Sequence, residues 1–444
     1  MSNATADQHE ARLTAEELRE TWDVLSEDER AEGFGMLRRT EREDFFLDAD
    51  ARDQKQILAF LPHAERRAWL RLLPPDDAAD LLQLHEPPDR EPLLAALDDV
   101  TRREVVALLA YAEDDAGGLM NPRFARVRPD MSVDEAISYL RRQARDRLET
   151  IYYAYVLDPE QRLLGVVSFR DLFAARPEQT VSDVMVRDPV TVREDMDQEA
   201  VSQVFVHHDL LAVPVVDSAG RMKGLVTIDD IVDVVQEEAT EDIQRAGGTE
   251  VLGAPYLAVP LPAMLKKRAG WLAALFLGEM LTATAMARYE DEIAKAVVLA
   301  LFVPLIISSG GNSGSQASTL VIRAMALGEV RLRDWWRVAH REVVSGVGLG
   351  LILGAIGVVR VLAWQALFHS YGAHAGAIAA TVGVTLVGVV TWGCIAGSML
   401  PFLLRRIGFD PASASAPFVA TLVDVSGLVI YFTAASFILG GRLL

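Results

Sequence analysis

Residues 412–439 form an apolar stretch that is long enough to cross a lipid bilayer, and its single charged residue is Asp424. A membrane-spanning helix needs about 20 residues. A carboxylate in the middle of such a helix costs about 2.5–3.5 kcal/mol on insertion scales, so it usually faces a polar path, a partner group or an ion. The alternative is a protonated or hydrogen-bonded aspartate that only joins neighbouring helices. The fold must therefore include a membrane helix that carries an internal acid.

Four more apolar stretches precede this one, which gives an odd number of predicted spans. Basic residues lie before the first span at Lys266–Arg268, between the second and third at Arg323–Arg341, and after the fourth at Arg405–Arg406. Basic loops stay in the cytoplasm. We therefore expect a multi-pass protein of the cytoplasmic membrane, with its N-terminus in the cytoplasm and its C-terminus outside. A second acid, Glu279, lies in the first span without an assigned role. The predicted spans are 269–288, 294–322, 343–366, 376–403 and 412–439.

A second group of polar residues lies within the apolar stretch 304–320. Glycines at 310, 311 and 314 permit either close helix approach or a local break in the helix. Neutral oxygen and amide groups lie between them. One carboxylate combined with neutral oxygens is the ligand chemistry of a hard cation such as Mg²⁺. The neutral side chains are those of Asn312, Ser313, Ser315 and Gln316.

The two ends of the chain differ strongly in charge. Residues 265–444 hold 14 basic and 9 acidic residues, so the 43 basic and 63 acidic residues of the whole chain leave 29 and 54 for residues 1–264. Such an acidic segment argues against nucleic-acid binding, and it suits a region whose charge is balanced by metal cations or simply by solvent. The single cysteine, Cys394, excludes a disulfide framework within the chain.

Residues 13–112 have apolar positions at three- and four-residue spacing, which predicts short helices stacked in pairs, and residues 1–12 are predicted to be a disordered tail. Residues 113–180 and 181–240 repeat one α/β pattern. Asp130-Met131 recurs as Asp195-Met196, and Gly165 recurs as Gly224. Each copy ends in an S/T-x-x-D run, Ser168–Asp171 and Thr227–Asp230.

The segment that follows is strongly acidic from Asp230 to Asp242. Residues three and four apart share a helix face, so the carboxylates repel one another. They are either solvated or bridged by divalent cations. A connecting helix is predicted over 241–268.

PLIISSGGNSGSQASTL at 304–320 and GFDPASASAPFVATLVDVSGLVIYF at 408–432 resemble the MgtE family of magnesium channels, and the resemblance covers nearly the whole chain. It implies a multidomain fold: an α-helical N domain, an α/β tandem pair of cystathionine-β-synthase (CBS) domains, and an all-α transmembrane domain of five helices. It also implies a homodimer in which Mg²⁺ is both substrate and regulator. Ser315 departs from the asparagine common in the family.

The resemblance implies three sets of site residues. The pore set lines the path with Asp424, Asn312 and the carbonyls near Gly310, Gly311, Ala420 and Thr421. A regulatory set binds Mg²⁺ and closes the channel. ATP is a possible ligand of the first CBS copy. Asp410 serves either as a helix cap or in an inner vestibule. The regulatory set is Glu199, Asp209, Asp230, Asp233, Glu238 and Glu241, and the nucleotide set is Tyr153, Arg170 and Asp171.

Two other functions remain open. A transporter of Mg²⁺ or Co²⁺ that is coupled to a proton or sodium gradient would use Asp424 in alternating states, although five spans cannot form two inverted halves. The other hypothesis is a CBS-regulated enzyme or scaffold that is anchored in the membrane. No Ser/His/Asp cluster, P-loop or glycine-rich cofactor loop is evident in the sequence, so we expect a protein that is not an enzyme.

Overall fold

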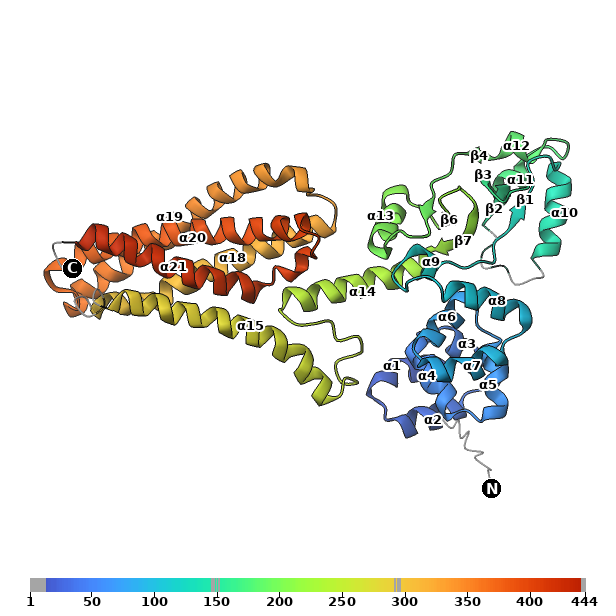
Figure 1. The fold of residues 1–444 in the computed structure, drawn as a ribbon, viewed down its shortest axis with the longest axis horizontal. Helices are drawn as coiled ribbons and strands as arrows, with labels where there is room; N and C mark the ends of the chain where they lie inside the picture. The colour runs from blue at the N-terminus through green and yellow to red at the C-terminus, as the bar shows by residue number, and fades with distance from the viewer. Residues whose placement is uncertain are drawn as a thin grey trace, which may run out of the picture. The chain divides into compact units, whose positions relative to one another are not determined.

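The computed structural model describes residues 13–144, 148, 150, 152–290, 293 and 297–440 (Figure 1). The predicted tail 1–12 lies outside the described residues. The chain divides into two compact units, Met1–Val235 and Gln236–Leu444, and each is described by itself.

The first unit begins with a run of short helices. Capping explains where several of them start: the side chains of Thr14 and Ser26 each accept a hydrogen bond from the backbone three residues on, and Pro75 and Pro87 occupy first-turn positions. The elements are α1 (Ala15–Thr21), η1 (Trp22–Val24), α2 (Glu27–Met36), α3 (Arg39–Leu47), α4 (Ala51–Phe60), α5 (His63–Leu70), α6 (Pro75–Gln83), α7 (Pro87–Ala96) and α8 (Asp99–Leu108).

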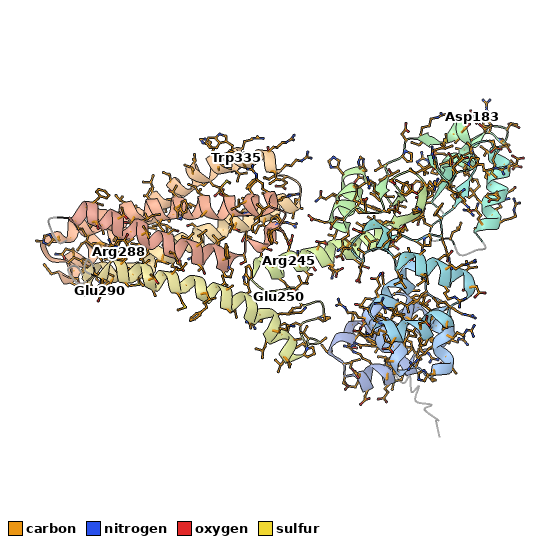
Figure 2. The ribbon with its side chains drawn as sticks, viewed as in Figure 1. Asp183, Arg245, Glu250, Arg288, Glu290 and Trp335 are labelled. Carbon is orange, nitrogen blue, oxygen red and sulfur yellow. The ribbon has the colours of Figure 1, made fainter. Side chains whose placement is uncertain are left out.

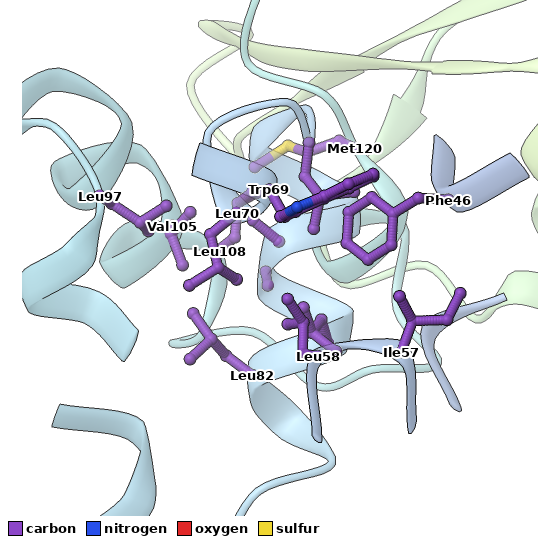
Figure 3. Close-up of a cluster of buried hydrophobic side chains, with 14 of the residues drawn as sticks. Phe46, Ile57, Leu58, Trp69, Leu70, Leu82, Leu97, Val105, Leu108 and Met120 are labelled. Atoms are coloured by element: carbon purple, nitrogen blue, oxygen red, sulfur yellow. The ribbon is translucent and has the colours of Figure 1, made fainter. Parts of the chain in front are cut away.

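One buried cluster holds these helices together (Figure 3). The rings of Phe46 and Trp69 meet edge to face at 5.3 Å, and Ile57 is completely buried. The same cluster includes Met120 and Val192, which lie beyond the helices in sequence. The helical region and the following α/β region of this unit therefore share one hydrophobic core.

The α/β region contains two sheets of related topology. The first has the order β1-β2-β3-β4 and the second the order β5-β6-β7, each beginning with a parallel pair followed by an antiparallel pair. The elements are α9 (Ala116–Leu119), β1 (Arg126–Val127), α10 (Val133–Gln143), β2 (Tyr153–Leu157), β3 (Leu163–Ser168), α11 (Phe169–Ala174), α12 (Val181–Val184), β4 (Val186–Arg187), β5 (Val192–Arg193), α13 (Gln198–His208), β6 (Ala212–Val216) and β7 (Met222–Thr227).

The two copies match in detail. The β2–β3 pairing shifts register between Val156 and Leu157, and the β6–β7 pairing shifts at the corresponding place, between Val215 and Val216. Isolated bridges join the copies at Asn121 with Leu225 and at Arg162 with Arg221. The predicted internal repeat is therefore a structural repeat as well.

Helix α14 (Ile228–Ala246) follows β7 and carries the acidic segment. The prediction of one connecting helix over 241–268 is wrong. Residues 241–246 end α14, residues 247–260 are not helical, and residues 261–268 begin the next helix. The reason is the run of helix-breaking residues: Gly248 and Gly253 both adopt positive φ, and two prolines, Pro255 and Pro260, follow.

The second unit is built from long helices (Figure 1). Within the described residues, five helical segments are long and apolar enough to cross a membrane: 261–288, 297–326, 332–368, 372–406 and 416–439. This confirms the predicted helical membrane architecture. The elements are α15 (Leu261–Arg288), α17 (Val297–Ala300), α18 (Val303–Ala326), η2 (Leu332–Asp334), α19 (Trp335–Phe368), η3 (Gly372–His374), α20 (Ala375–Arg406), η4 (Pro411–Ser413) and α21 (Ala416–Leu439).

Glycines bring α18 and α20 into backbone contact. A Cβ atom on Gly314 would lie 3.0 Å from the carbonyl oxygen of Gly393, and a Cβ on Gly397 would collide with the carbonyl oxygen of Gly314. Small residues let membrane helices approach closely in this way. The sequence left close approach or a helix break open at Gly310, Gly311 and Gly314, and α18 runs unbroken through all three.

Candidate functional site

The carboxylate of Asp424 lies where α21 meets α18. A Cβ atom placed on Gly311 would lie 3.5 Å from the Oδ1 atom of Asp424 and 3.4 Å from the Cβ atom of Ala420. Asp424 is half-buried and Gly311 is buried. Both distances are ordinary van der Waals contacts, so Gly311 faces the acid across the α18–α21 interface, and the structure brings together three of the residues predicted for the pore.

The other predicted pore residues have different surroundings. Asn312 is exposed, and its Nδ2 atom donates to the Oγ of Ser308 at 3.4 Å. Gly310 packs instead against Val389 and Val423. Thr421 donates to the carbonyl oxygen of Pro417 at 3.0 Å. Gly310, Ala420 and Thr421 all lie within unbroken helices, where a carbonyl normally accepts from the residue four positions on.

Two serines of α18 hold the start of α21. Ser315 donates to the carbonyl oxygen of Ala416 at 3.1 Å, and Ser318 donates to that of Ala414 at 2.8 Å. Ser315 is the position at which the sequence departs from the family. Its hydroxyl fixes the helix that carries Asp424, a role that sequence spacing could not reveal because the partners are 101 residues apart.

Asp410 has both a capping and an ion-pairing role. Its Oδ1 atom accepts from the backbone nitrogen of Ala412 at 2.8 Å and so caps the short helix η4, whereas Ser415 caps α21, and its Oδ2 atom accepts from Arg245. Arg245 also pairs with Glu241 at 2.8 Å (Figure 2 labels Arg245 near the end of α14). Burial, together with the charges of Asp410 and Glu238, raises the pKa of Asp242, while Arg245 and Arg323 act in the opposite direction.

A second group of acids lies in the first unit, where α14 begins. Burial raises the pKa of Asp77, on α6, to about 7, and the charges of Asp230, Asp229 and Asp233 add to the rise. The pKa of Asp230 rises to about 6, chiefly through burial, although Thr227 donates to its Oδ2 atom at 2.8 Å. We call Asp77, Asp229, Asp230 and Asp233 the α6–α14 acidic group.

Asp77 was missed by the sequence reasoning. It follows Pro75 in the first turn of a helix, where acids are common for helix-dipole reasons. The pairing of α6 with α14 is tertiary, so no local spacing signals it. Burial likewise raises the pKa of Asp233, with added contributions from Asp229 and Asp50.

The predicted regulatory residues are divided between the two units. Asp230 and Asp233 lie together in the first unit, whereas Glu238 and Glu241 belong to the second. Glu199, in the first turn of α13, and Asp209, at its C-terminal cap with φ of 52°, are exposed. Over the described part of the chain, no three His, Cys, Asp or Glu side chains already converge as a metal site.

The predicted nucleotide residues gather at one end of the first sheet. Tyr153 on β2 is paired in register with Ser168 on β3. The Oγ of Ser168 donates to the Oδ2 of Asp171 at 2.6 Å and accepts from its backbone nitrogen at 3.0 Å, so this motif also caps α11. Arg170 is exposed beside it.

Three family profiles match the chain in order. They are "MgtE intracellular N domain" over residues 13–114, "CBS domain" over 116–178 and 181–237, and "MgtE: Divalent cation transporter" over 303–434. The chain is also 43% identical over 367 residues to the magnesium transporter MgtE of Thermus thermophilus, an alignment that covers 82% of this chain and 79% of the relative. The chain belongs to the MgtE family.

Other MgtE relatives are similar over most of their length. The magnesium transporter MgtE of Enterococcus faecalis is 35% identical, covering 75% of this chain and 71% of the relative, and that of Bacillus subtilis is 30% identical, covering 81% and 78%. A solved structure of the cytosolic domain of the Mg²⁺ channel MgtE in complex with ATP is 40% identical, with a TM-score of 0.47, and covers 50% of this chain and 91% of its own.

Membership of this family indicates the general class of function. The chain matches a family described as divalent cation transporters over residues 303–434, its described residues include five helices long and apolar enough to cross a membrane, and the relatives named above are magnesium transporters. The helical, CBS and membrane regions expected from the sequence are all present.

Proposed function

We propose that this MgtE-family chain is a channel that imports Mg²⁺ into the cytoplasm through a path lined by Asp424. The observation that supports the proposal is the position of the half-buried Asp424 carboxylate, which faces Gly311 where α21 packs against α18. A carboxylate is costly at this depth unless it meets an ion or polar partner.

Mg²⁺ loses its water reluctantly and prefers about six oxygen ligands near 2.1 Å. The side chains near Asp424 offer few direct ligands, since Gly311 and Ala420 have no polar side-chain atoms. The ion would therefore pass with much of its water shell, which Asp424 holds through hydrogen bonds. Selection would act on the size and charge of the hydrated ion.

We infer that the working unit is a homodimer. One chain presents a single Asp424 on a half-buried face of α21, while Asn312 on α18 is exposed. A two-fold axis beside this face would bring two copies of Asp424 to one path. By the positive-inside rule, Lys266–Arg268 and Arg405–Arg406 remain in the cytoplasm, so that the N-terminus is cytoplasmic and the C-terminus is outside the cell membrane.

We propose that internal Mg²⁺ closes this channel at the α6–α14 acidic group. Asp77, Asp230 and Asp233 lie close enough to disfavour one another's ionised forms. These are hard oxygen donors, which fit Mg²⁺. Bound Mg²⁺ would supply the positive charge that holds α6 against the start of α14. Without it, the repulsion between these carboxylates favours their separation, which is a population shift. The exposed carboxylates of Glu199 and Asp209 would also contribute to regulatory Mg²⁺ binding.

ATP is a second proposed regulator, at the first CBS copy. Tyr153, Arg170 and Asp171 lie at the end of β2 and β3, where an aromatic ring, a cation and a carboxylate could receive a base, a phosphate and a ribose. In the free protein, Asp171 is bonded to Ser168. Nucleotide binding would therefore need to replace or share that bond.

The alternative function is a gradient-coupled transporter of Mg²⁺ or Co²⁺. The carboxylate of Asp424 would then alternate between a protonated state and a metal-bound state during transport. The five-helix arrangement favours the channel, because coupled transporters are commonly built from inverted repeats.

Flux in proteoliposomes tests the proposed function. We expect Mg²⁺ uptake by the native chain without any proton or sodium gradient, and a loss of at least about tenfold with Asp424→Asn, since the ion then loses its only carboxylate on α21. Uptake that requires a gradient would support the transporter. Equal uptake by both proteins would make Asp424 structural and overturn the proposed path.

A further inference from the structure

Glu279 is an acid within α15, the first of the membrane-spanning helices. It lies on α15, eleven residues beyond Arg268. At a rise of about 1.5 Å per residue this is roughly 16 Å along the helix, about halfway through a hydrocarbon core that is about 30 Å thick. Its side chain is exposed in the single chain. A carboxylate facing acyl chains there would cost about 2.5–3.5 kcal/mol, so a polar neighbour is expected.

Helices α15 and α21 pack side by side in one parallel register. The indole nitrogen of Trp271 donates to the Oγ of Ser415 at 3.3 Å. A Cβ atom on Gly278 would lie 2.9 Å from the methyl carbon of Thr421. Further along, the rings of Tyr289 and Phe432 stack at 4.8 Å. Each partner stands 143 or 144 residues further along the chain, so the register does not slip between these contacts.

This register fixes the level of Glu279 relative to Asp424. Glu279 follows Gly278, so it is level with Leu422, the residue after Thr421. Asp424 is two residues further on, which is about 3 Å along the helix axis. The close approach at Gly278 brings the two helices together at this level. The two carboxylates therefore lie at nearly the same depth on adjacent helices.

The two acids together give one protomer two negative charges at one level of the membrane. With few waters to screen them, such charges repel strongly and attract a divalent ion more than a monovalent one. We propose that Glu279 is a specificity-determining residue of the ion path, which with Asp424 of the same protomer balances the two charges of one hydrated Mg²⁺ ion. This inference rests on the proposed path at Asp424.

The test compares Glu279→Gln with native protein in proteoliposomes of the full chain. Gln keeps the size of the side chain and removes its charge. We expect the Mg²⁺ concentration for half-maximal flux to rise about fivefold, with maximal flux changed less, and the Mg²⁺-to-K⁺ permeability ratio to fall by a similar factor. Glu279→Asp should restore most of the native selectivity. If Gln prevents folding, the Asp variant alone should still show a smaller shift in the same direction.

Glu342→Gln is the matched control, because Glu342 is an acid of α19 whose charged neighbour is Arg341 rather than Asp424. It should leave both half-saturation and selectivity unchanged. Native half-saturation and native selectivity in Glu279→Gln would overturn the inference. When Asp424→Asn abolishes flux in the same preparation, native behaviour of Glu279→Gln rejects only the role of Glu279. When Asp424→Asn is also without effect, the proposed path itself fails.

Discussion

The two halves of α14 carry acids in similar number but in opposite electrostatic settings. In the first unit, the charges that act most on Asp77 are all negative, those of Asp230, Asp229 and Asp233. In the second unit, Asp410 and Glu241 share Arg245 as a cationic partner. Arg245 thus partly offsets the acids of the second unit, whereas every charge that acts on Asp77 in the first unit is negative. A site that senses a dissolved cation requires the arrangement in the first unit, where the charges acting on Asp77 are all negative, since an arginine in the site would take the place of the ion permanently.

The largest expected effect comes from neutralising the α6–α14 acidic group. With Asp230→Asn and Asp233→Asn combined, we expect the internal Mg²⁺ concentration that closes the channel to rise at least about tenfold, because the charges that bind the ion are gone. The measurement is single-channel or flux recording over a range of internal Mg²⁺.

The control for that experiment changes exposed acids on α13 instead. Glu199→Gln alone should shift closure less, because Glu199 is exposed and the charges that raise the pKa of Asp77 are those of Asp230, Asp229 and Asp233. Native closure in the double variant would mean that these residues are not the sensor, and the contrast between the two halves of α14 would lose its functional meaning.

A smaller effect is expected at the self-neutralised group. Arg245→Ala leaves Asp410 and Glu241 without their shared cation, so the variant should lose about 1 kcal/mol of stability, as is usual for partly exposed pairs. Added Mg²⁺ should restore part of this lost stability in the variant, because the ion can replace the missing positive charge. The native second unit should gain no such stability from Mg²⁺.

Thermal unfolding of the full chain in detergent, with EDTA or with Mg²⁺, measures this change. Arg245→Lys keeps the charge and should behave nearly as the native protein. If Arg245→Ala gains no Mg²⁺ dependence, the acids of the second unit are not held together by charge balance, and the comparison with the α6–α14 group fails.

The smallest effect concerns pH. The folded pKa values of Asp77 and Asp230, about 7 and about 6, lie above the ordinary value of 3.8. The folded state therefore binds these protons more tightly than the unfolded chain, so their contribution is full below pH 3.8 and is lost as pH rises through 6 and 7. In EDTA, we expect the unfolding temperature of the first unit to fall from pH 5 to pH 8.

Asp77→Asn should remove part of this pH dependence, because one of the titrating groups is then absent. Saturating Mg²⁺ should also reduce it, since the ion competes with the protons for the same carboxylates. An unfolding temperature that rises between pH 5 and pH 8 in EDTA would contradict the unfavourable ionisation of this group.

Sequence alone reached the membrane helices and the repeated α/β copies because both depend on local pattern. The apolar runs around Asp424 and the recurrence of Gly165 as Gly224 are visible without a fold. Close approach and a helix break are both compatible with the sequence at Gly311 and Gly314, and only the packing of Gly314 against α20 in an unbroken α18 decides between them.

The missed features all depend on residues far apart in the chain. Arg245 and Asp410 are 165 residues apart, and the charge of Asp230 acts on Asp77 only through the tertiary fold, since the two residues lie on different helices. The connecting helix failed for the opposite reason. Its helix-breaking residues, including Gly248 and Pro255, are local features that the sequence shows directly.

The backbone contacts of α18 with α20 have a consequence for how such a protein can change over evolution. Where Gly314 meets Gly393 and Gly397, the spacing of the two helices is set by main-chain atoms, which mutation cannot shorten. Any replacement there adds atoms and forces the helices apart. The frame beside Asp424 can therefore widen but not narrow, and a lineage that adapts to a smaller or differently charged ion must do so through the side chains facing the path.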